Sequence, residues 1–198
     1  MADNYLEKRE QELREARPKA VHVRPSLDSL LKRNCTYGGF DQTALPSREK
    51  LLEILEVTRF VGSSGNAQPL RYRLLTEDEA RLLHPLVKQD AAAPGAYIVI
   101  CSIAPLGRDV YTDLGMAAQS ILLKAAESGL GGVLITDFDA DAVSGALSLP
   151  FPPAGIIGLG KPAGQAFIVD ASGERPLSLY RKNDVLFVPR LPVKDILI

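Results

Sequence analysis

The chain has 198 residues, of which 46% are hydrophobic and 24% charged, a balance that is typical of folded globular domains and excludes a disordered chain. Its formal net charge is −1, which argues against nucleic acid or an anionic membrane as a partner, because both need a basic surface. No apolar run approaches the ~20 residues of a bilayer span. Two cysteines and two histidines cannot easily build a disulfide framework or a metal site. We therefore expect a soluble, cytoplasmic protein without a metal.

The first residues form a highly charged segment. Residues 3–17 predict a helix with charged side chains on most faces, in which Glu10 and Arg14 are spaced as a favourable helical pair. Pro18 ends this helix. Two interpretations stay open: a solvated decoration, or an arm that lies across a partner subunit. We expect residues 1–25 to form this arm and residues 26–198 to form a single domain.

The rest of the chain predicts a mixture of helices and strands. Apolar periodicity and capping residues predict helices over 28–33, 47–60, 77–88, 113–128 and 139–147. β-Branched and alternating segments predict strands over 71–75, 96–103, 131–136, 155–160 and 165–170. Because helices and strands do not alternate strictly, the sequence favours an α+β fold over a doubly wound parallel sheet.

Two of these segments need an apolar surface to cover them. The helix over 113–128 carries small or apolar residues on nearly every face, so we expect it to be buried in the domain or in a dimer interface. The tail over 186–198 is extended and apolar, and Pro189 and Pro192 exclude an interior helix there. A neighbouring subunit could supply the surface that this tail requires.

No side chain stands out as a catalyst. Neither His22 nor His84 has a carboxylate at a suggestive spacing, and Cys101 lies inside an apolar strand, so all three are interpreted as surface or packing residues. The glycine motifs that bind dinucleotides or nucleoside triphosphates are absent. If the protein is an enzyme, its difficult chemistry is therefore expected to come from a bound cofactor.

Three polar segments could bind such a cofactor. Residues 32–37 combine cations, small polar groups and a phenol at a helix end, and residues 63–69 place hydroxyls and two amides in seven positions. These groups can read the donor and acceptor edge of a flat heterocycle, although a polar surface loop has the same composition. The third is Arg190, a charge in an apolar tail that needs a partner such as a phosphate.

Taken in order, these segments resemble the FMN-dependent nitroreductase family. The family's R-x-S-x-R motif corresponds to residues 33–37, and its P-S-x-x-N-x-Q-P motif to residues 62–69. Its long central helix followed by Gly-Leu-Gly corresponds to residues 113–131. Its Gly-Lys-Pro turn corresponds to 160–162, and its closing arginine with Leu-Pro to 190–192. The resemblance covers roughly residues 26–198.

This resemblance implies an α+β fold with a mixed or antiparallel sheet flanked by helices, and an intertwined homodimer with FMN bound at the interface. It assigns FMN binding to Arg33, Asn34, Cys35, Tyr37, Ser63, Ser64, Asn66, Gln68, Thr136, Asp137 and Arg190. The two arginines would bind the phosphate, and Cys35 and Tyr37 would lie near the ribityl chain and the ring. The serines and Asn66 would reach the flavin from the other subunit. A backbone N–H near Thr136 or Asp137 would donate to flavin N5.

Three positions depart from the family pattern. Cys35 replaces a serine, Tyr37 replaces a basic residue and Gly62 replaces a proline. A thiol is a weaker hydrogen-bonding group than a hydroxyl. A cation near the N1–C2 edge of the flavin stabilises the reduced anion, so its loss is expected to lower the reduction potential.

The resemblance implies an NAD(P)H-dependent FMN oxidoreductase that reduces nitroaromatics, quinones or similar electron-poor small molecules by a ping-pong mechanism. Such hydride transfer depends on positioning and not on a side-chain acid or base, which agrees with the absence of a candidate catalyst. Two alternatives remain open from the sequence. One is a non-catalytic FMN-binding or flavin-handling protein on the same fold, and the other is a structural dimer without a cofactor.

Overall fold

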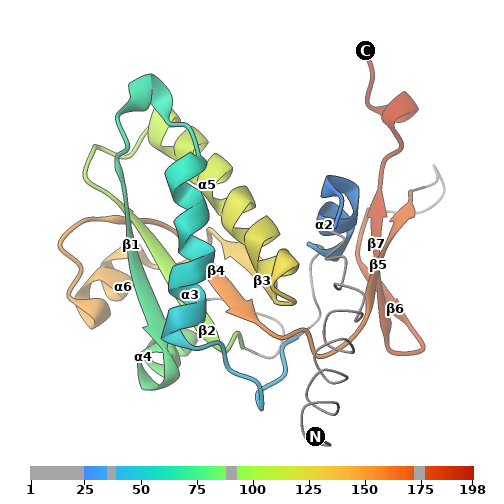
Figure 1. Cartoon of the computed structure of the whole chain (residues 1–198), viewed down its shortest axis with the longest axis horizontal. Helices are drawn as coiled ribbons and strands as arrows, with labels where there is room; N and C mark the ends of the chain where they lie inside the picture. The colour runs from blue at the N-terminus through green and yellow to red at the C-terminus, as the bar shows by residue number, and fades with distance from the viewer. Residues whose placement is uncertain (1–24, 35–38, 88–92, 172–176) are drawn as a thin grey trace, which may run out of the picture.

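A four-stranded antiparallel sheet forms the centre of the structure, a computed structural model that describes residues 25–34, 39–87, 93–171 and 177–198 (Figure 1). Its order is β1 (Leu70–Thr76), β2 (Ala96–Ser102), β4 (Pro153–Gly160) and β3 (Gly131–Ile135). Every residue of β2 and β4 is buried. These strands are therefore covered on both faces, as their continuous apolar sequence requires.

Helices cover both faces of this central sheet. On one face lie α3 (Arg48–Leu55) and α5 (Arg108–Glu127), and on the other α4 (Glu77–Leu83) and α6 (Ala140–Leu147). The side chains of β2 contribute alternately to the two hydrophobic cores, because successive side chains of a strand point to opposite faces of the sheet. Ile98 and Ile100 pack with α3 and α5, whereas Tyr97 and Val99 pack with α4 and α6. The result is a three-layer α+β body, which confirms the predicted fold class.

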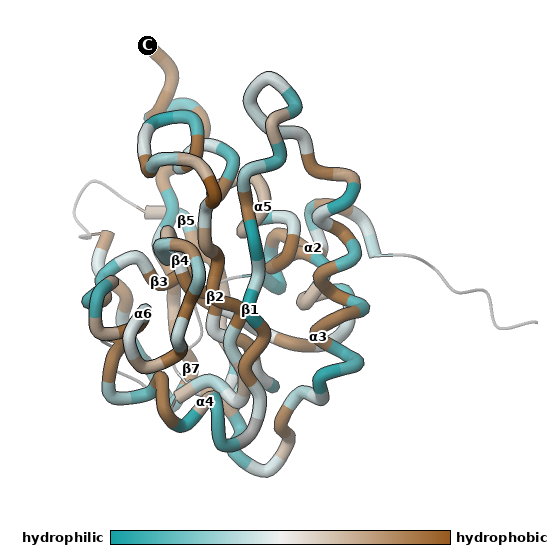
Figure 2. Tube along the Cα trace, turned by 90° about the vertical axis from the view of Figure 1, so that its left-hand side faces the viewer, coloured by the Kyte–Doolittle hydropathy of each residue, from teal (hydrophilic) through white to brown (hydrophobic). Residues whose placement is uncertain are grey.

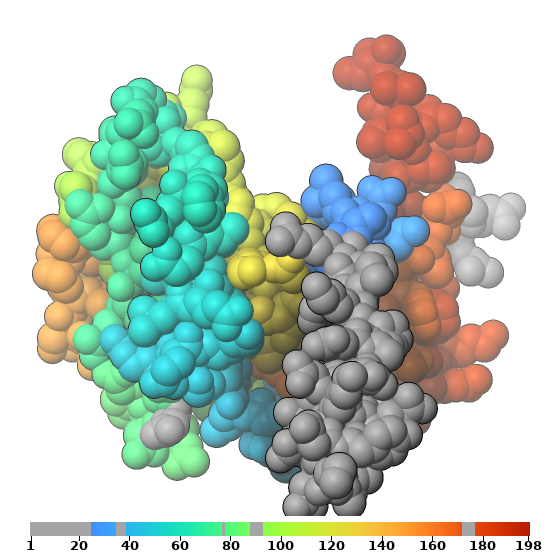
Figure 3. Space-filling model, in the orientation of Figure 1, coloured from blue at the N-terminus to red at the C-terminus, as the bar shows by residue number. Residues whose placement is uncertain are grey.

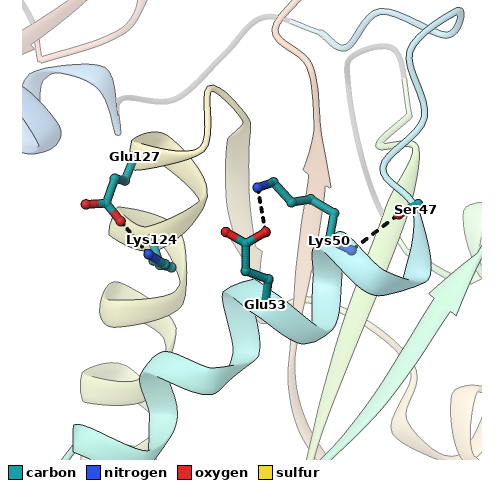
Figure 4. Close-up of polar contacts among 5 residues, drawn as sticks. All are labelled: Ser47, Lys50, Glu53, Lys124 and Glu127. Carbon is teal, nitrogen blue, oxygen red and sulfur yellow. Dashed lines mark hydrogen bonds and ion pairs between the residues drawn. The ribbon is translucent and has the colours of Figure 1, made fainter. Parts of the chain in front are cut away.

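The helix α3 starts with a cap and lies beside α5 (Figure 4). The Ser47 Oγ accepts a hydrogen bond from the Lys50 backbone N–H at 3.3 Å. A hydrogen bond from the Lys50 side chain, with the positive charges of Lys50 and Lys124, holds the pKa of Glu53 below its usual value. Such exposed ion pairs contribute little free energy, so the buried Leu51 and Ile54 fix α3 on the sheet.

The connection between α5 and β3 depends on two glycines. Gly129 ends the helix with a φ of 78°, a left-handed conformation that glycine adopts without strain. Gly132 follows in β3, where a Cβ would lie 2.5 Å from Cδ2 of Leu122 and 2.7 Å from Cδ2 of Leu159. The close approach of α5 to the sheet thus requires glycine at position 132.

A second, smaller sheet follows the central one in the chain. Here β5 (Ala166–Asp170) pairs with β7 (Val185–Arg190) in parallel, and β6 (Tyr180–Lys182) pairs with β7 antiparallel. This C-terminal sheet stands to one side of the central body, with α2 (Leu27–Arg33) between them (Figure 1). Its core consists of Leu186 and Val188, with Ala166 packed against them.

The C-terminal segment beyond β7 projects from the molecule (Figure 3). It contains one short 3-10 turn, η4 (Val193–Asp195), and is apolar at its end (Figure 2). Its exposed apolar side chains are Leu191, Val193, Ile196, Leu197 and Ile198. The prediction of an extended apolar tail is therefore confirmed, and within one chain nothing covers these described residues.

Other predictions are confirmed in part or lie outside the described residues. The helix predicted over 113–128 begins earlier, at Arg108, and it buries only one face in its own chain: Tyr111 is 51% exposed and Met116 41%. The strand β6 is absent from the predicted elements. The predicted helix over 3–17, Cys35 and Tyr37 lie outside the described residues. None of the described helices combines the length and the apolar character of a membrane span.

Candidate functional site

The polar loop over residues 62–69 has an unusual backbone conformation. Gly65, Asn66 and Gln68 have φ values of 57°, 55° and 48°, and a positive φ is strained for a side chain as long as glutamine. Hydrogen bonds inside the loop hold this shape: the Ser63 Oγ accepts from the Gln68 backbone N–H at 3.0 Å, and the Asn66 Oδ1 accepts from the Gln68 Nε2 at 3.3 Å. Strain of this kind is retained where function needs a defined geometry.

The loop is tied to α5 by a buried carboxylate. Asp113 lies in the second turn of α5 and is only 2% exposed. Its Oδ1 accepts a hydrogen bond from the backbone N–H of Ser64 at 2.8 Å. Its Oδ2 is buried and has no hydrogen-bond partner among the described residues. A buried polar atom without a partner is rare in folded proteins and marks this position as one of interest.

At its other end the loop is tied to β1. The Arg71 Nη1 donates to the backbone carbonyls of Gln68 at 3.1 Å and of Leu70 at 2.8 Å. Arg71 also borders a cavity of about 250 Å³ beneath the loop, together with Arg59 and Tyr72. Burial raises the pKa of Tyr72, and a hydrogen bond with Thr58 opposes part of that rise. The cavity thus has two guanidinium groups at its wall and hydroxyl and amide groups on its loop side.

A second cavity, of about 300 Å³, lies between the loop and the start of α5. Ser64, Ala67 and Pro69 border it from the loop, and Gly107 and Arg108 from the helix. Asp113 borders both cavities. The loop therefore spans open space on both sides, and hydrogen bonds rather than dense packing hold it.

The segment after β3 borders a third cavity. Thr136 lines a hollow of about 360 Å³ whose other walls are largely apolar, among them Leu114 and Phe138. Asp137 is exposed beside it. Leu114 is the neighbour of Asp113 in α5, so the loop and Thr136 lie against the same half of this helix. The structure brings these two predicted parts of the site to one end of the central body.

The predicted phosphate-binding residues lie elsewhere. Arg33 is the last residue of α2, and Asn34 caps that helix, its backbone N–H donating to the Leu30 carbonyl at 2.8 Å. Arg190 ends β7, is exposed, and donates from Nη1 to the Pro189 carbonyl at 3.3 Å. In Figure 1 the loop lies at the top of the central body, whereas α2 lies between this body and the C-terminal sheet that contains β7. Within one chain, the arginines and the loop are not brought together.

Two residues set aside in the sequence, His84 and Cys101, have packing roles, and His22 lies outside the described residues. His84 packs its ring edge against Tyr97, with ring centroids 5.6 Å apart. Cys101 is buried in β2, and burial raises the pKa of its thiol, so it is a poor nucleophile at neutral pH. Among the described residues, no group of three histidine, cysteine or acidic side chains could hold a metal ion.

One residue of the site is absent from the predicted set. Asp113 appears in the sequence as the single acidic residue of the segment 113–126, whose remaining side chains are mostly small or apolar. A lone acid on the apolar side of an amphipathic helix is the signal that could have revealed it, because such a charge is costly to bury without a role.

Comparison with known proteins agrees with the fold. Residues 106–161 match the model of the nitroreductase family. A nitroreductase family protein of Clostridium difficile shares 22% identity, covering 88% of this chain and 98% of that one, with a TM-score of 0.65. A proposed nitroreductase of Exiguobacterium sibiricum, solved in complex with FMN, shares 17% identity over 88% of this chain and 97% of that one, with a TM-score of 0.64.

A proposed NAD(P)H:FMN oxidoreductase of Staphylococcus epidermidis shares 18% identity over 87% of this chain and 95% of that one, with a TM-score of 0.66. No curated protein has significant sequence similarity to the chain. The resemblance to the nitroreductase family is thus confirmed for the segment 106–161 and for the fold as a whole. The motifs at 33–37, 62–69 and 190–192 lie outside the matched segment.

Proposed function

We propose that this protein is an FMN-dependent oxidoreductase in which NAD(P)H reduces the flavin and an electron-poor small molecule, such as a nitroaromatic or a quinone, then reoxidises it by a ping-pong mechanism. The observation that carries the proposal is the strained loop over 62–69, fixed at both ends and presenting hydroxyl and amide groups. It occurs on a fold for which a structure with bound FMN is known.

The residues present fit the three chemical parts of FMN. The pyrimidine edge of a flavin needs hydrogen-bond donors and acceptors, which Ser63, Asn66 and Gln68 carry. The apolar part of the ring suits the wall that Thr136 borders. Its phosphate needs cations, and we assign Arg33 and Arg190 to it, with Asn34, Cys35 and Tyr37 near the ribityl chain.

A complete site needs a second copy of the chain. The loop and the arginines lie apart in one molecule, and a partner that contributes the missing part of the site would bring them together. The projecting C-terminal segment supports such an arrangement, because Val193 is 66% exposed and Leu197 73%. Large apolar side chains gathered on one exposed segment are typical of an interface. We therefore propose a homodimer with FMN sites built from both chains.

The chain's own contribution to the reaction would be binding and orientation. When bound, FMN supplies the redox chemistry, accepting and donating the hydride. The loop residues Ser63, Ser64 and Asn66 would fix one edge of the ring, and a backbone N–H near Thr136 or Asp137 would donate a hydrogen bond beside the reacting position. Holding the flavin and the molecule that reacts with it in one geometry would lower the barrier to hydride transfer without a side-chain acid or base.

The test begins with the visible absorption spectrum of the purified protein and identification of any released chromophore. We expect a flavin spectrum and a chromophore that elutes as FMN, followed by oxidation of NADH or NADPH that depends on a nitroaromatic or quinone acceptor. A colourless protein that does not bind added FMN would contradict the proposal.

A second candidate is a non-catalytic protein that binds or handles FMN. The departures at Cys35 and Tyr37 favour it, because both reduce the polar and cationic character of the first motif. It predicts bound FMN without turnover of NAD(P)H. Steady-state turnover with an acceptor would eliminate this candidate.

A further inference from the structure

The carboxylate of Asp113 is placed as a support for the loop over 62–69. Asp113 lies in α5, 49 residues further along the chain than Ser64. Its Oδ1 accepts a hydrogen bond from the Ser64 backbone N–H at 2.8 Å. At 2% exposure it is shielded from water, so this hydrogen bond competes little with solvent. A donor–acceptor distance of 2.8 Å is that of a well-formed N–H···O hydrogen bond.

Packing alone does not hold the loop in its observed shape. A Cβ at Gly62 or Gly65 would meet no atom within 4 Å, so there is open space around both positions. Cavities of about 250 and 300 Å³ border the loop. Asn66 and Gln68 nevertheless keep positive φ values of 55° and 48°. A strained backbone persists only when its surroundings fix it, and here those fixed points are hydrogen bonds.

The unpartnered oxygen of Asp113 argues against a purely structural role. An apolar side chain of similar shape would avoid the cost of burying a carboxylate, but it would leave the Ser64 N–H without its acceptor. The Oδ2 nevertheless has no hydrogen-bond partner among the described residues, although it is buried. The protein therefore keeps a buried carboxylate at position 113 although its unpartnered oxygen lowers the stability of the fold. Such a loss of stability is expected at functional sites.

We propose that Asp113 is a positioning residue: its Oδ1 fixes the Ser64 amide and thereby holds the hydroxyl and amide groups of the loop in the arrangement that binds FMN. The inference rests on the proposed function for its consequence, the affinity for FMN. The anchoring itself can be observed in the protein without FMN.

The first experiment compares Asp113→Asn with Asp113→Ala. Asparagine keeps an oxygen acceptor and nearly the same volume, whereas alanine removes the acceptor. In full-length protein without FMN, we expect Asp113→Ala to increase hydrogen exchange at the Ser64 amide by about 10-fold or more, because the amide loses its acceptor. In titrations with FMN, the same variant is expected to weaken binding by about 10- to 100-fold. Asp113→Asn should restore most of both properties.

A second pair of variants approaches the same hydrogen bond from the loop. Ser64→Pro removes the donor N–H at the first position of the 3-10 turn η2 (Ser64–Asn66), where proline is tolerated. Ser64→Ala removes only the hydroxyl. We expect Ser64→Pro to weaken FMN binding beyond the effect of Ser64→Ala, and to add little when combined with Asp113→Ala, because both changes break one interaction. If Asp113→Ala does not fold, the comparison of Ser64→Pro with Ser64→Ala still tests the same hydrogen bond.

Asp141→Ala serves as the matched control, since Asp141 is an exposed acid in the first turn of α6, on the other face of the sheet. It should change neither exchange at Ser64 nor FMN affinity. Unchanged exchange in Asp113→Ala, additive effects with Ser64→Pro, or an asparagine variant as impaired as the alanine variant would overturn the positioning role. If wild-type protein binds no FMN, the proposed function fails and the affinity consequence with it, while exchange at Ser64 still decides the anchoring.

Discussion

In the central sheet, β2 and β4 bury every residue, whereas in the C-terminal sheet no residue of β5 is fully buried. The central sheet has a helical layer and a separate hydrophobic core on each face. In the C-terminal sheet only three residues are buried, Leu186, Val188 and Pro189, all of them in β7, and Phe167 and Ile168 are exposed. A sheet this poorly covered is only marginally stable by itself.

The two regions also divide the candidate site. The loop over 62–69 and Thr136 belong to the central body, whereas Arg33 and Arg190 belong to α2 and the C-terminal sheet. The difference teaches that one region is covered within a single chain, whereas the other leaves much of its apolar surface exposed. On the proposed function, the phosphate-binding charges belong to this exposed region and to α2, which lies beside it.

The largest expected effect is on the free energy of unfolding, which a substitution in the central sheet should lower more than a substitution in the C-terminal sheet. Ile157→Ala removes a fully buried side chain of β4 and should lower the free energy of unfolding by about 2–5 kcal/mol, because a cavity is left in a dense core. Ile168→Ala in β5, where the side chain is 39% exposed, should cost less than about 1 kcal/mol. Urea unfolding at low protein concentration measures both. Equal losses would show that the C-terminal sheet is as well packed as the central one.

The second prediction tests whether a partner covers the C-terminal segment. Val193→Asp with Leu197→Asp places two charges on exposed apolar positions, and burying an unpaired charge in an interface is costly. We expect a homodimer for the wild type and at least a roughly 100-fold weaker dimer for the double variant, measured by analytical ultracentrifugation. Leu82→Asp, on the exposed side of α4, is the control and should not change association. A monomeric wild type would contradict the proposed assembly.

The third prediction concerns the two arginines that we assign to the phosphate, Arg33 of α2 and Arg190 of the C-terminal sheet. Arg33→Ala and Arg190→Ala should each weaken FMN binding by about 10- to 100-fold, because each removes a charge-assisted hydrogen bond to a phosphate. Arg48→Ala, an exposed arginine of α3, is the matched control. Fluorescence titration with FMN measures the affinity. Retained activity of the double variant without added FMN would refute the phosphate assignment.

The elements that the sequence predicts well are those with a physical pattern along the chain. The strand over 96–103 is recognisable because it is continuously apolar and β-branched, and burial on both faces confirms it. The loop over 62–69 is recognisable from its glycines and polar residues. The helix α2 follows from its capping serine, Ser26, whose side chain accepts from the Ser29 N–H. In each case local chemistry and tertiary packing agree.

Two elements were harder to predict for identifiable reasons. The helix α5 starts at Arg108, where the residues before Asp113 are mostly polar or exposed and carry no apolar periodicity. The strand β6 has three residues, too few for a pattern, although the Asn183-Asp184 pair after it marks a tight hairpin through its φ values of 50° and 61°. The prediction of the site was limited for another reason. The contact between Asp113 and Ser64 joins residues 49 positions apart, and the spacing of residues along the chain does not reveal such a contact.

The smallest expected effect lies at the joint between the two regions, where residues 39–41 meet residues 161–163. The Asp41 N–H donates to the Lys161 carbonyl at 2.8 Å, and the Ala163 N–H donates to the Gly39 carbonyl at 3.1 Å. Hydrogen bonds from Thr43, aided by the positive charge of Lys161, hold the pKa of Asp41 below its usual value. A carboxyl whose pKa is lower in the folded state stabilises the fold above its unfolded pKa, and this stabilisation is lost as the pH falls through the folded pKa.

We therefore expect Asp41→Asn to lower the urea midpoint slightly at neutral pH. Its effect should be smaller at acidic pH, once the pH has fallen through the lowered pKa of Asp41 and the wild-type carboxyl is protonated as well. The shift should be smaller than that of any variant above, because the Lys161 side chain is 58% exposed and solvent screens its interaction with Asp41. Asp195→Asn, an exposed acid of η4 beyond the joint, is the control. A shift of equal size at both pH values would mean that Asp41 contributes through its size and neutral hydrogen bonds, and that its charge does not stabilise the joint.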